Sequence, residues 1–281
     1  MNRHLAFRIS AGIFLKFLIL GCVLAVTAVR AEDISIPGSG NCEFVLAQLA
    51  KAFNASQNRH RVSVPPSTGT AGALRDLNDD KATIGRVGRP LREAETAKGL
   101  TYFSMGRDPV VFAGGKGVSA KTITDAQLLD VYAGKIRDWR ELGGSAGPIR
   151  AIGREETDTS RQSISRVIKS FGTMKYHEGV KVVNLDPQMI ELFDRYPTSF
   201  GFLNRSALYA AKSKLTLLAL GGVEPTADNV ESGRYPIVLE FGLAYKAITL
   251  TDAGRQFMAY IGSPAGARIL REYGVLPAAP R

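Results

Sequence analysis

One local pattern occurs three times in this chain: a short apolar stretch, a turn rich in glycine and hydroxyl side chains, and a segment with helical spacing. The three turns are residues 38–41, 67–70 and 157–160. Strand-like and helix-like segments that alternate in this way are typical of the α/β class, and we expect mainly parallel sheets. Because ligands of open α/β sheets lie at the carboxyl ends of the strands, these turns are candidate ligand sites.

Apolar spacing indicates the remaining elements. Strands are expected at 34–36, 62–64, 149–152 and 200–202. Helices are expected after each of the three turns, at 125–132, around 189–193, and as one long last helix that begins at 251–254. In the helix after the third turn, the residues expected to share one buried face are Ile164, Val167, Ile168 and Phe171. Elsewhere we expect Cys42 and Trp139 to be buried and His60 and His177 to be exposed.

The stretch Gly153–Arg161 carries the clearest chemical signal. It follows an apolar strand and opens a helix whose first N–H groups lack intrahelical partners, and the helix dipole there favours negative charge. Arg154 could add a charge-assisted contact to an oxyanion. Asp158 opposes this interpretation, because its carboxylate would repel an anion.

Residues 1–31 have the features of a cleavable secretory signal. Basic residues precede an apolar run over 17–29, and we expect cleavage after Ala31. The run is too short to span a bilayer comfortably. Lipidation at Cys22 is disfavoured, because the apolar stretch continues past that cysteine. The sequence therefore predicts an exported protein, and the family resemblance described below implies that its compartment is the periplasm.

The charge and the cysteines exclude several classes. The formal net charge is +10, and the signal segment carries four basic residues and no acidic ones, so residues 32–281 keep +6 without a basic block. Nucleic-acid binding usually needs a clustered basic stripe, so we expect none; a mild positive bias fits steering of small anions. After cleavage one cysteine and two histidines remain, which disfavours a zinc site, and we expect no metal or cofactor.

Five stretches, in this order, resemble the periplasmic phosphate-binding proteins of ABC transporters. They are residues 82–91, 134–139, 153–161, 198–202 and 232–237. The resemblance covers almost the whole chain after the signal segment. It implies an α/β, two-lobed periplasmic binding protein fold with two chain crossovers and a ligand cleft between the lobes, which closes by a hinge motion.

The expected crossovers lie at the apolar strands 110–113 and 238–245. Lobe one would then be 32–111 plus 239–281, and lobe two 112–238. The ligand contacts that the resemblance implies are Ser39, Gly40 and Asn41 of the first turn, Thr70 of the second, and Arg154, Asp158, Thr159 and Ser160 of the third.

Two positions depart from the family pattern. Gly88 stands where the best-known phosphate binders have an aspartate, and Asp158 where they have a serine. One interpretation is that Asp158 has taken over as acceptor for the proton of monohydrogen phosphate, with Arg89 as a further contact that offsets its charge. The other is that Asp158 only caps the following helix. Arg89 and Arg86 could also both be surface residues.

The leading function is a non-catalytic solute-binding protein, expected to be a monomer, that captures phosphate or a related oxyanion and delivers it to an ABC permease. A second is a sensor or scavenger of an organophosphate or another anion without a transporter. A third, a secreted hydrolase that uses Ser160 or Thr159, is disfavoured because neither histidine lies in a stretch that suggests a catalytic base.

Overall fold

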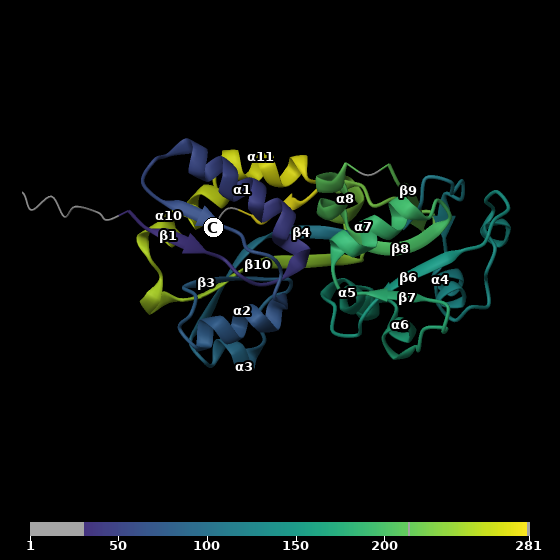
Figure 1. The fold of residues 1–281 in the computed structure, drawn as a ribbon, viewed down its shortest axis with the longest axis horizontal. Coiled ribbons are helices and arrows are strands. Elements are labelled where there is room, and N and C mark those ends of the chain that lie inside the picture. Colours follow the sequence, from purple (N-terminus) through teal and green to yellow (C-terminus); the bar gives the residue numbers. More distant parts are fainter. Residues whose placement is uncertain (1–30, 213, 280–281) are drawn as a thin grey trace, which may run out of the picture. The chain divides into compact units, whose positions relative to one another are not determined.

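The computed structural model describes residues 31–212 and 214–279, and they form a mixed α/β structure (Figure 1). The expected α/β class is thus confirmed. The signal segment lies outside the described residues except for Ala31, as does Cys22. None of the helices in the described part is both long and apolar enough to span a membrane.

The strands follow the expected positions closely. They are β1 (Asp33–Ser35), β2 (Arg61–Ser63), β3 (Ile84–Val87), β4 (Leu100–Gly114), β5 (Thr122–Ile123), β6 (Arg150–Arg154), β7 (Lys181–Val183), β8 (Ser199–Asn204), β9 (Thr216–Leu220), β10 (Val238–Lys246) and β11 (Leu276–Pro277).

The helices lie between them. The α-helices are α1 (Glu43–Ser56), α2 (Gly69–Asn78), α3 (Glu93–Thr96), α4 (Asp125–Tyr132), α5 (Thr159–Val167), α6 (Lys169–Thr173), α7 (Asp186–Arg195), α8 (Arg205–Ala211), α9 (Ala227–Glu231), α10 (Asp252–Ile261) and α11 (Pro264–Glu272). Three 3₁₀ turns are η1 (Gly40–Cys42), η2 (Trp139–Leu142) and η3 (Ala247–Thr249).

Strand β4 organises the larger sheet, whose main order is β3-β10-β4-β8-β6-β7. Its residues 100–109 pair with β10 and its residues 110–114 pair with β8, both antiparallel. Parallel pairs are found between β1 and β2, β5 and β9, β6 and β7, and β6 and β8. The expectation of mainly parallel sheets is therefore wrong at the centre, because the two long strands run in opposite directions.

The two faces of β4 support different apolar clusters, since successive side chains of a strand point to opposite faces. Val110 and Phe112 belong to the main core, which also includes residues of α1, α4 and α10. Val111 and Ala113 belong to a second cluster with residues of α7 and α8. Each face of the long strand is thus covered, and Cys42 and Trp139 are buried as expected.

Two expected helices are interrupted. The long last helix is α10 followed by α11, because Ser263 caps a new helix that begins with Pro264. The helix after the third turn is broken at Ile168, whose backbone is not helical. This break lets Ile164, Ile168 and Phe171 all reach the core, whereas Val167 is 40% exposed, contrary to expectation.

His60 is buried rather than exposed, and the Gln57 side chain accepts a hydrogen bond from His60 N and donates one to the carbonyl oxygen of His60. Its Nε2 atom lies 3.7 Å from Asp252 Oδ2 on α10. His177 is half-buried and contacts Arg137, with 3.1 Å between His177 Nε2 and Arg137 Nη2. Both histidines therefore pack against other elements.

Candidate functional site

The first turn is shaped by close backbone contact between residues 38–39 and β3. Gly38 has φ +136°, and a Cβ there would lie 2.1 Å from the carbonyl oxygen of Arg86, so only glycine fits. Ser39 N donates to that same carbonyl at 3.0 Å. Ser39 caps η1, in which Asn41 is buried. The turn is therefore held against β3 by its own backbone.

Arg86 holds this turn together from beneath. Its side chain is fully buried and donates to the carbonyl oxygens of Ile36, Ser39 and Pro65. It also forms an ion pair with Glu43, with 2.9 Å between Nη2 and Oε2. The interpretation of Arg86 as a surface residue is thus wrong, because three backbone carbonyls and one carboxylate occupy its guanidinium.

The second turn meets the first at Gly88. Thr70 lies in the first turn of α2, and its Oγ1 accepts a hydrogen bond from Gly88 N at 3.1 Å. A Cβ on Gly88 would lie 2.7 Å from Ser39 Oγ and 2.8 Å from Thr159 Oγ1. Hydroxyl groups from all three turns therefore converge on this glycine, and the absence of a side chain gives them room.

The third turn begins helix α5. Asp158 is its N-cap, and Asp158 Oδ1 accepts from Ser160 N and Arg161 N, both at 3.0 Å. Asp158 thus caps the helix, but capping is not its only contact, because its Oδ2 atom also pairs with Arg154. Thr159 and Ser160 are buried just inside the helix. The cap leaves their hydroxyls free to point toward the first turn.

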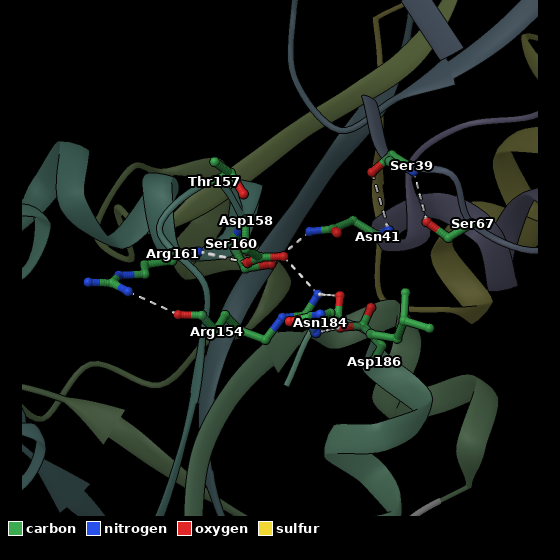
Figure 2. A network of polar contacts seen from close by, with 12 residues as sticks. Ser39, Asn41, Ser67, Arg154, Thr157, Asp158, Ser160, Arg161, Asn184 and Asp186 are labelled. Carbon is green, nitrogen blue, oxygen red and sulfur yellow. Dashed lines mark hydrogen bonds and ion pairs between the residues drawn. The ribbon is translucent and has the colours of Figure 1, made fainter. Parts of the chain in front are cut away.

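A direct hydrogen bond links the first and third turns. Asn41 Nδ2 donates to Ser160 Oγ at 2.7 Å, and both residues are buried (Figure 2). The two residues are 119 positions apart in the sequence. A ligand held between these turns would replace this bond with contacts of its own.

Arg154, at the end of β6, lies between two carboxylates. Its Nη2 atom is 2.7 Å from Asp158 Oδ2 and its Nη1 atom is 2.7 Å from Asp186 Oδ1 (Figure 2). Nη2 also donates to the carbonyl oxygen of Asn184 at 3.0 Å. Both terminal nitrogens of the guanidinium are thus engaged within the protein.

Asp186 is a member of this group that the sequence reasoning missed. It begins α7, where an acidic residue before a proline is a common helix-start signal, and nothing in the sequence links it to Arg154. Burial raises the pKa of Asp186, although Arg154 acts to lower it. Burial acts to lower the pKa of Arg154, but Asp186 and Asp158 outweigh it and raise that pKa, so the guanidinium stays charged.

Arg89 is directed elsewhere. Its guanidinium forms a bidentate ion pair with Glu95 of α3, with distances of 2.8 Å from Nη1 to Oε2 and 2.7 Å from Nη2 to Oε1. The hydrogen bond from Arg89 holds the pKa of Glu95 below its usual value. The structure thus brings together the other expected contacts but not the Arg89 side chain. In the described part of the chain no group of His, Cys, Asp and Glu side chains could hold a metal ion.

Comparisons with known proteins agree with this arrangement. The family described as a PBP superfamily domain matches residues 25–265. The phosphate-binding protein PstS of Borreliella burgdorferi is 22% identical over 86% of this chain and 89% of its own length. That of Bacillus subtilis is 24% identical over 82% of this chain and 75% of its own length.

Solved structures share the fold. A structure from Clostridium perfringens with bound phosphate, assigned as the substrate-binding protein of a phosphate ABC transporter, aligns with TM-score 0.77 and 23% identity over 88% of this chain and all of its own. An ABC-type phosphate transport receptor from Vibrio cholerae aligns with TM-score 0.65 and 22% identity over the same shares. The expected two-lobed α/β class is confirmed, and this chain belongs to the PBP superfamily.

Proposed function

We propose that this chain is a solute-binding protein, not an enzyme, that binds phosphate and delivers it to the permease of an ABC transporter. The observation that carries the proposal is the convergence of hydroxyl groups from three separate turns around Gly88. Hydroxyl and backbone N–H groups at a helix start are suited to an oxyanion. The names of the curated relatives and the phosphate in a similar solved structure support the same ligand.

The proposed contacts divide into two groups. Those with the ligand would come from the first two turns and the start of α5, namely Ser39, Gly40, Asn41, Thr70, Thr159 and Ser160. Arg154 and Asp158 would support them, since each already pairs with the other at 2.7 Å. Arg89 would remain with Glu95. In this arrangement Asp158 acts on the ligand through the helix cap and not as a direct proton acceptor.

We also propose lobes of 32–111 plus 239–281 and of 112–238. The change of partner along β4, from β10 before residue 110 to β8 after it, supports a crossover there. Strand β10 returns the chain beside β4. The link between Asn41 and Ser160 would then join one lobe to the other.

We also propose that the protein is exported to the periplasm, that it is cleaved after Ala31 and that it acts as a monomer. A sensor or scavenger without a transporter is the second candidate, and the same site would serve it. A neighbouring permease and ATPase gene pair would favour transport. Sequencing the amino terminus of the exported protein would test the cleavage site, with Glu32 expected first.

Equilibrium titration of residues 32–281 tests the ligand. We expect phosphate to bind and to raise the melting temperature, and sulfate, molybdate and simple phosphate esters to act more weakly. Gly88→Ala should weaken phosphate binding about tenfold or more, because its Cβ would displace the Ser39 and Thr159 hydroxyls.

Gly262→Ala is the matched control, because a Cβ there meets its nearest atoms at ordinary distances of 3.7 and 3.8 Å. This variant should bind like the parent protein. Failure of phosphate to bind the parent, or equal binding by the parent and Gly88→Ala, would contradict the proposed site.

A further inference from the structure

Asn41 of the first turn is contacted from two distant parts of the chain. Its side chain donates to Ser160 Oγ of the third turn at 2.7 Å, and its carbonyl oxygen accepts from Asn204 Nδ2, also at 2.7 Å. Asn204 is the last residue of β8 and the N-cap of α8, and it lies 163 positions from Asn41. A residue outside the three turns therefore holds the backbone of a side chain that links the first turn to the third.

The rest of the first turn has support of its own. Ser39 N donates to the carbonyl oxygen of Arg86 at 3.0 Å, and Arg86 Nε donates to the carbonyl oxygen of Ser39 at 2.8 Å. Asn41 lies beyond these contacts, and its own N–H reaches Ser39 Oγ at 3.4 Å, which is longer than an ordinary hydrogen bond. Asn204 thus supports the end of the turn that Arg86 does not hold.

The Asn204 amide is itself oriented by Asp108 of β4. Asn204 Nδ2 donates to Asp108 Oδ2 at 3.0 Å and to Ser206 Oγ at 2.8 Å, and Ser206 N donates to the same carboxyl. All three residues are fully buried. The opposite amide orientation would turn the acceptor Oδ1 toward the carbonyl oxygen of Asn41, which is also an acceptor. The surroundings therefore select the orientation in which Nδ2 faces Asn41.

This orientation leaves half of the amide unused. Asn204 Oδ1 is buried and has no hydrogen-bond partner among the described residues. A buried acceptor without a partner is destabilising, and in a folded protein it calls for a reason. Asn54 of α1 shows the ordinary arrangement, because its Nδ2 and Oδ1 atoms both pair with the backbone of Val62 at 2.9 Å. In Asn204 the contacts of Nδ2 are kept although Oδ1 stays unpaired.

We propose that Asn204 and Asp108 are positioning residues of the ligand site. Asp108 orients the Asn204 amide, and Asn204 holds the carbonyl of Asn41 so that the Asn41 side chain is directed at the third turn. This inference rests on the proposed function. Both residues act through Asn41, whose Nδ2 atom would donate to phosphate in place of Ser160 Oγ.

The physical reason is preorganisation. A donor that already points at the ligand loses little conformational freedom on binding, whereas a mobile donor must be ordered at that moment. Without the bond from Asn204, the peptide group of Asn41 is free to rotate and its side chain loses a fixed direction. The loss therefore affects binding through the Asn41 amide and leaves Ser39, which Arg86 holds, in place.

A double-mutant cycle on phosphate binding by residues 32–281 tests this role. Asn41→Ala and Asn204→Ala should each weaken binding about tenfold, as the loss of one hydrogen bond implies. In the Asn41→Ala background, Asn204→Ala should change the dissociation constant by less than about twofold, because no side chain remains to be positioned. A purely structural role of Asn204 would instead weaken binding equally in both backgrounds.

Asn229→Ala is the matched control. Asn229 Nδ2 donates to the carbonyl oxygen of Glu224 at 2.9 Å, outside the three turns, so the variant loses the same kind of bond. It should bind phosphate like the parent protein.

Substitutions of Asp108 provide a second, independent comparison. Asp108→Ala removes the acceptor that orients Asn204 and should weaken phosphate binding about tenfold, whereas Asp108→Asn keeps an oxygen acceptor in a side chain of the same shape and should stay within about threefold of the parent. This pair decides the question should Asn204→Ala fail to fold.

The outcomes separate the two proposals. Unchanged affinity in Asn204→Ala, or equal losses with and without the Asn41 side chain, would overturn the positioning role. Binding by Asp108→Asn as weak as that by Asp108→Ala would overturn it as well. Absence of phosphate binding by the parent would instead contradict the proposed function.

Discussion

Asp158 combines two structural tasks in one side chain. One carboxylate oxygen caps α5 and the other pairs with Arg154. A serine at this position could cap the helix but could not pair with a guanidinium. The aspartate therefore ties the start of α5 to the end of β6, which fixes where the Thr159 and Ser160 hydroxyls lie.

The two tasks predict different costs for two substitutions. Asp158→Ala removes both the cap and the charged hydrogen bond and should lower the free energy of unfolding by about 2–4 kcal/mol. Asp158→Ser keeps the cap and should cost about 1 kcal/mol less. Urea denaturation of residues 32–281 measures both, and equal stability of the two variants would show that the cap contributes nothing.

Among single residues, the sequence predicted candidates that lie in turns before helices. It missed a residue that approaches the third turn from a distant part of the sequence. Ser39, Thr70 and Ser160 were identified because each lies beside glycine or hydroxyl residues in a turn before a helix. Asp186 lies 32 positions after Arg154 and reaches it only through the packing of α7 against β7 and β8. No local spacing encodes such a contact.

Strand β4 joins the two halves of the larger sheet, and Asp108 lies two residues before its partner changes. Asp108 is fully buried and accepts from Ser206 N and from Asn204 Nδ2. Asn204 Nδ2 also donates to the carbonyl oxygen of Asn41 at 2.7 Å. Strand β4, the start of α8 and the first turn are thus connected through the Asp108 carboxyl and the Asn204 amide.

This connection predicts a pH dependence of stability. Burial raises the pKa of Asp108 to about 7, so the folded chain holds a proton that the unfolded chain releases near pH 4. Its contribution to the free energy of unfolding should therefore fall as pH rises from about 4 to about 7 and level off above. Asp108→Asn should lose this fall, with a change in melting temperature of several degrees between the two ends of the range.

Asp228→Asn is the control, because Asp228 is an exposed carboxylate on α9. Thermal melts of the parent and both variants across this pH range make the comparison. An Asp108→Asn variant whose stability still falls between pH 4 and pH 7 as steeply as the parent's would assign the effect to another group, such as Asp186.

Helices and strands could be predicted from the sequence where a single hydrophobic period extends along the whole element. Helix α4 has the predicted bounds, 125–132, and Thr124 caps its start. The antiparallel pairing of β4 with β10 was missed, because hydrophobic spacing identifies a strand without giving its direction. Strand direction here depends on the two crossings of the whole chain, which no local pattern contains.

The whole molecule has one main core despite its two-lobed class. A single apolar cluster includes Phe53 and Phe257 from one proposed lobe and Phe171 and Phe200 from the other. The buried link between Asn41 and Ser160 adds a polar connection between the same halves. Unfolding one half alone would therefore expose apolar surface of the other.

We expect residues 32–281 to unfold in one cooperative thermal transition, with and without phosphate. Phosphate at a hundred times its dissociation constant should stabilise the fold by about 2.7 kcal/mol, which corresponds to a rise of about 5–10 °C for a chain of this length. Scanning calorimetry measures the number of transitions and their shift.

Gly88→Ala should melt in one transition that phosphate shifts less, because the lost contacts lie at the ligand and not in the core. Two separate transitions, of which phosphate moved only one, would show that the lobes fold independently and that the ligand contacts a single lobe.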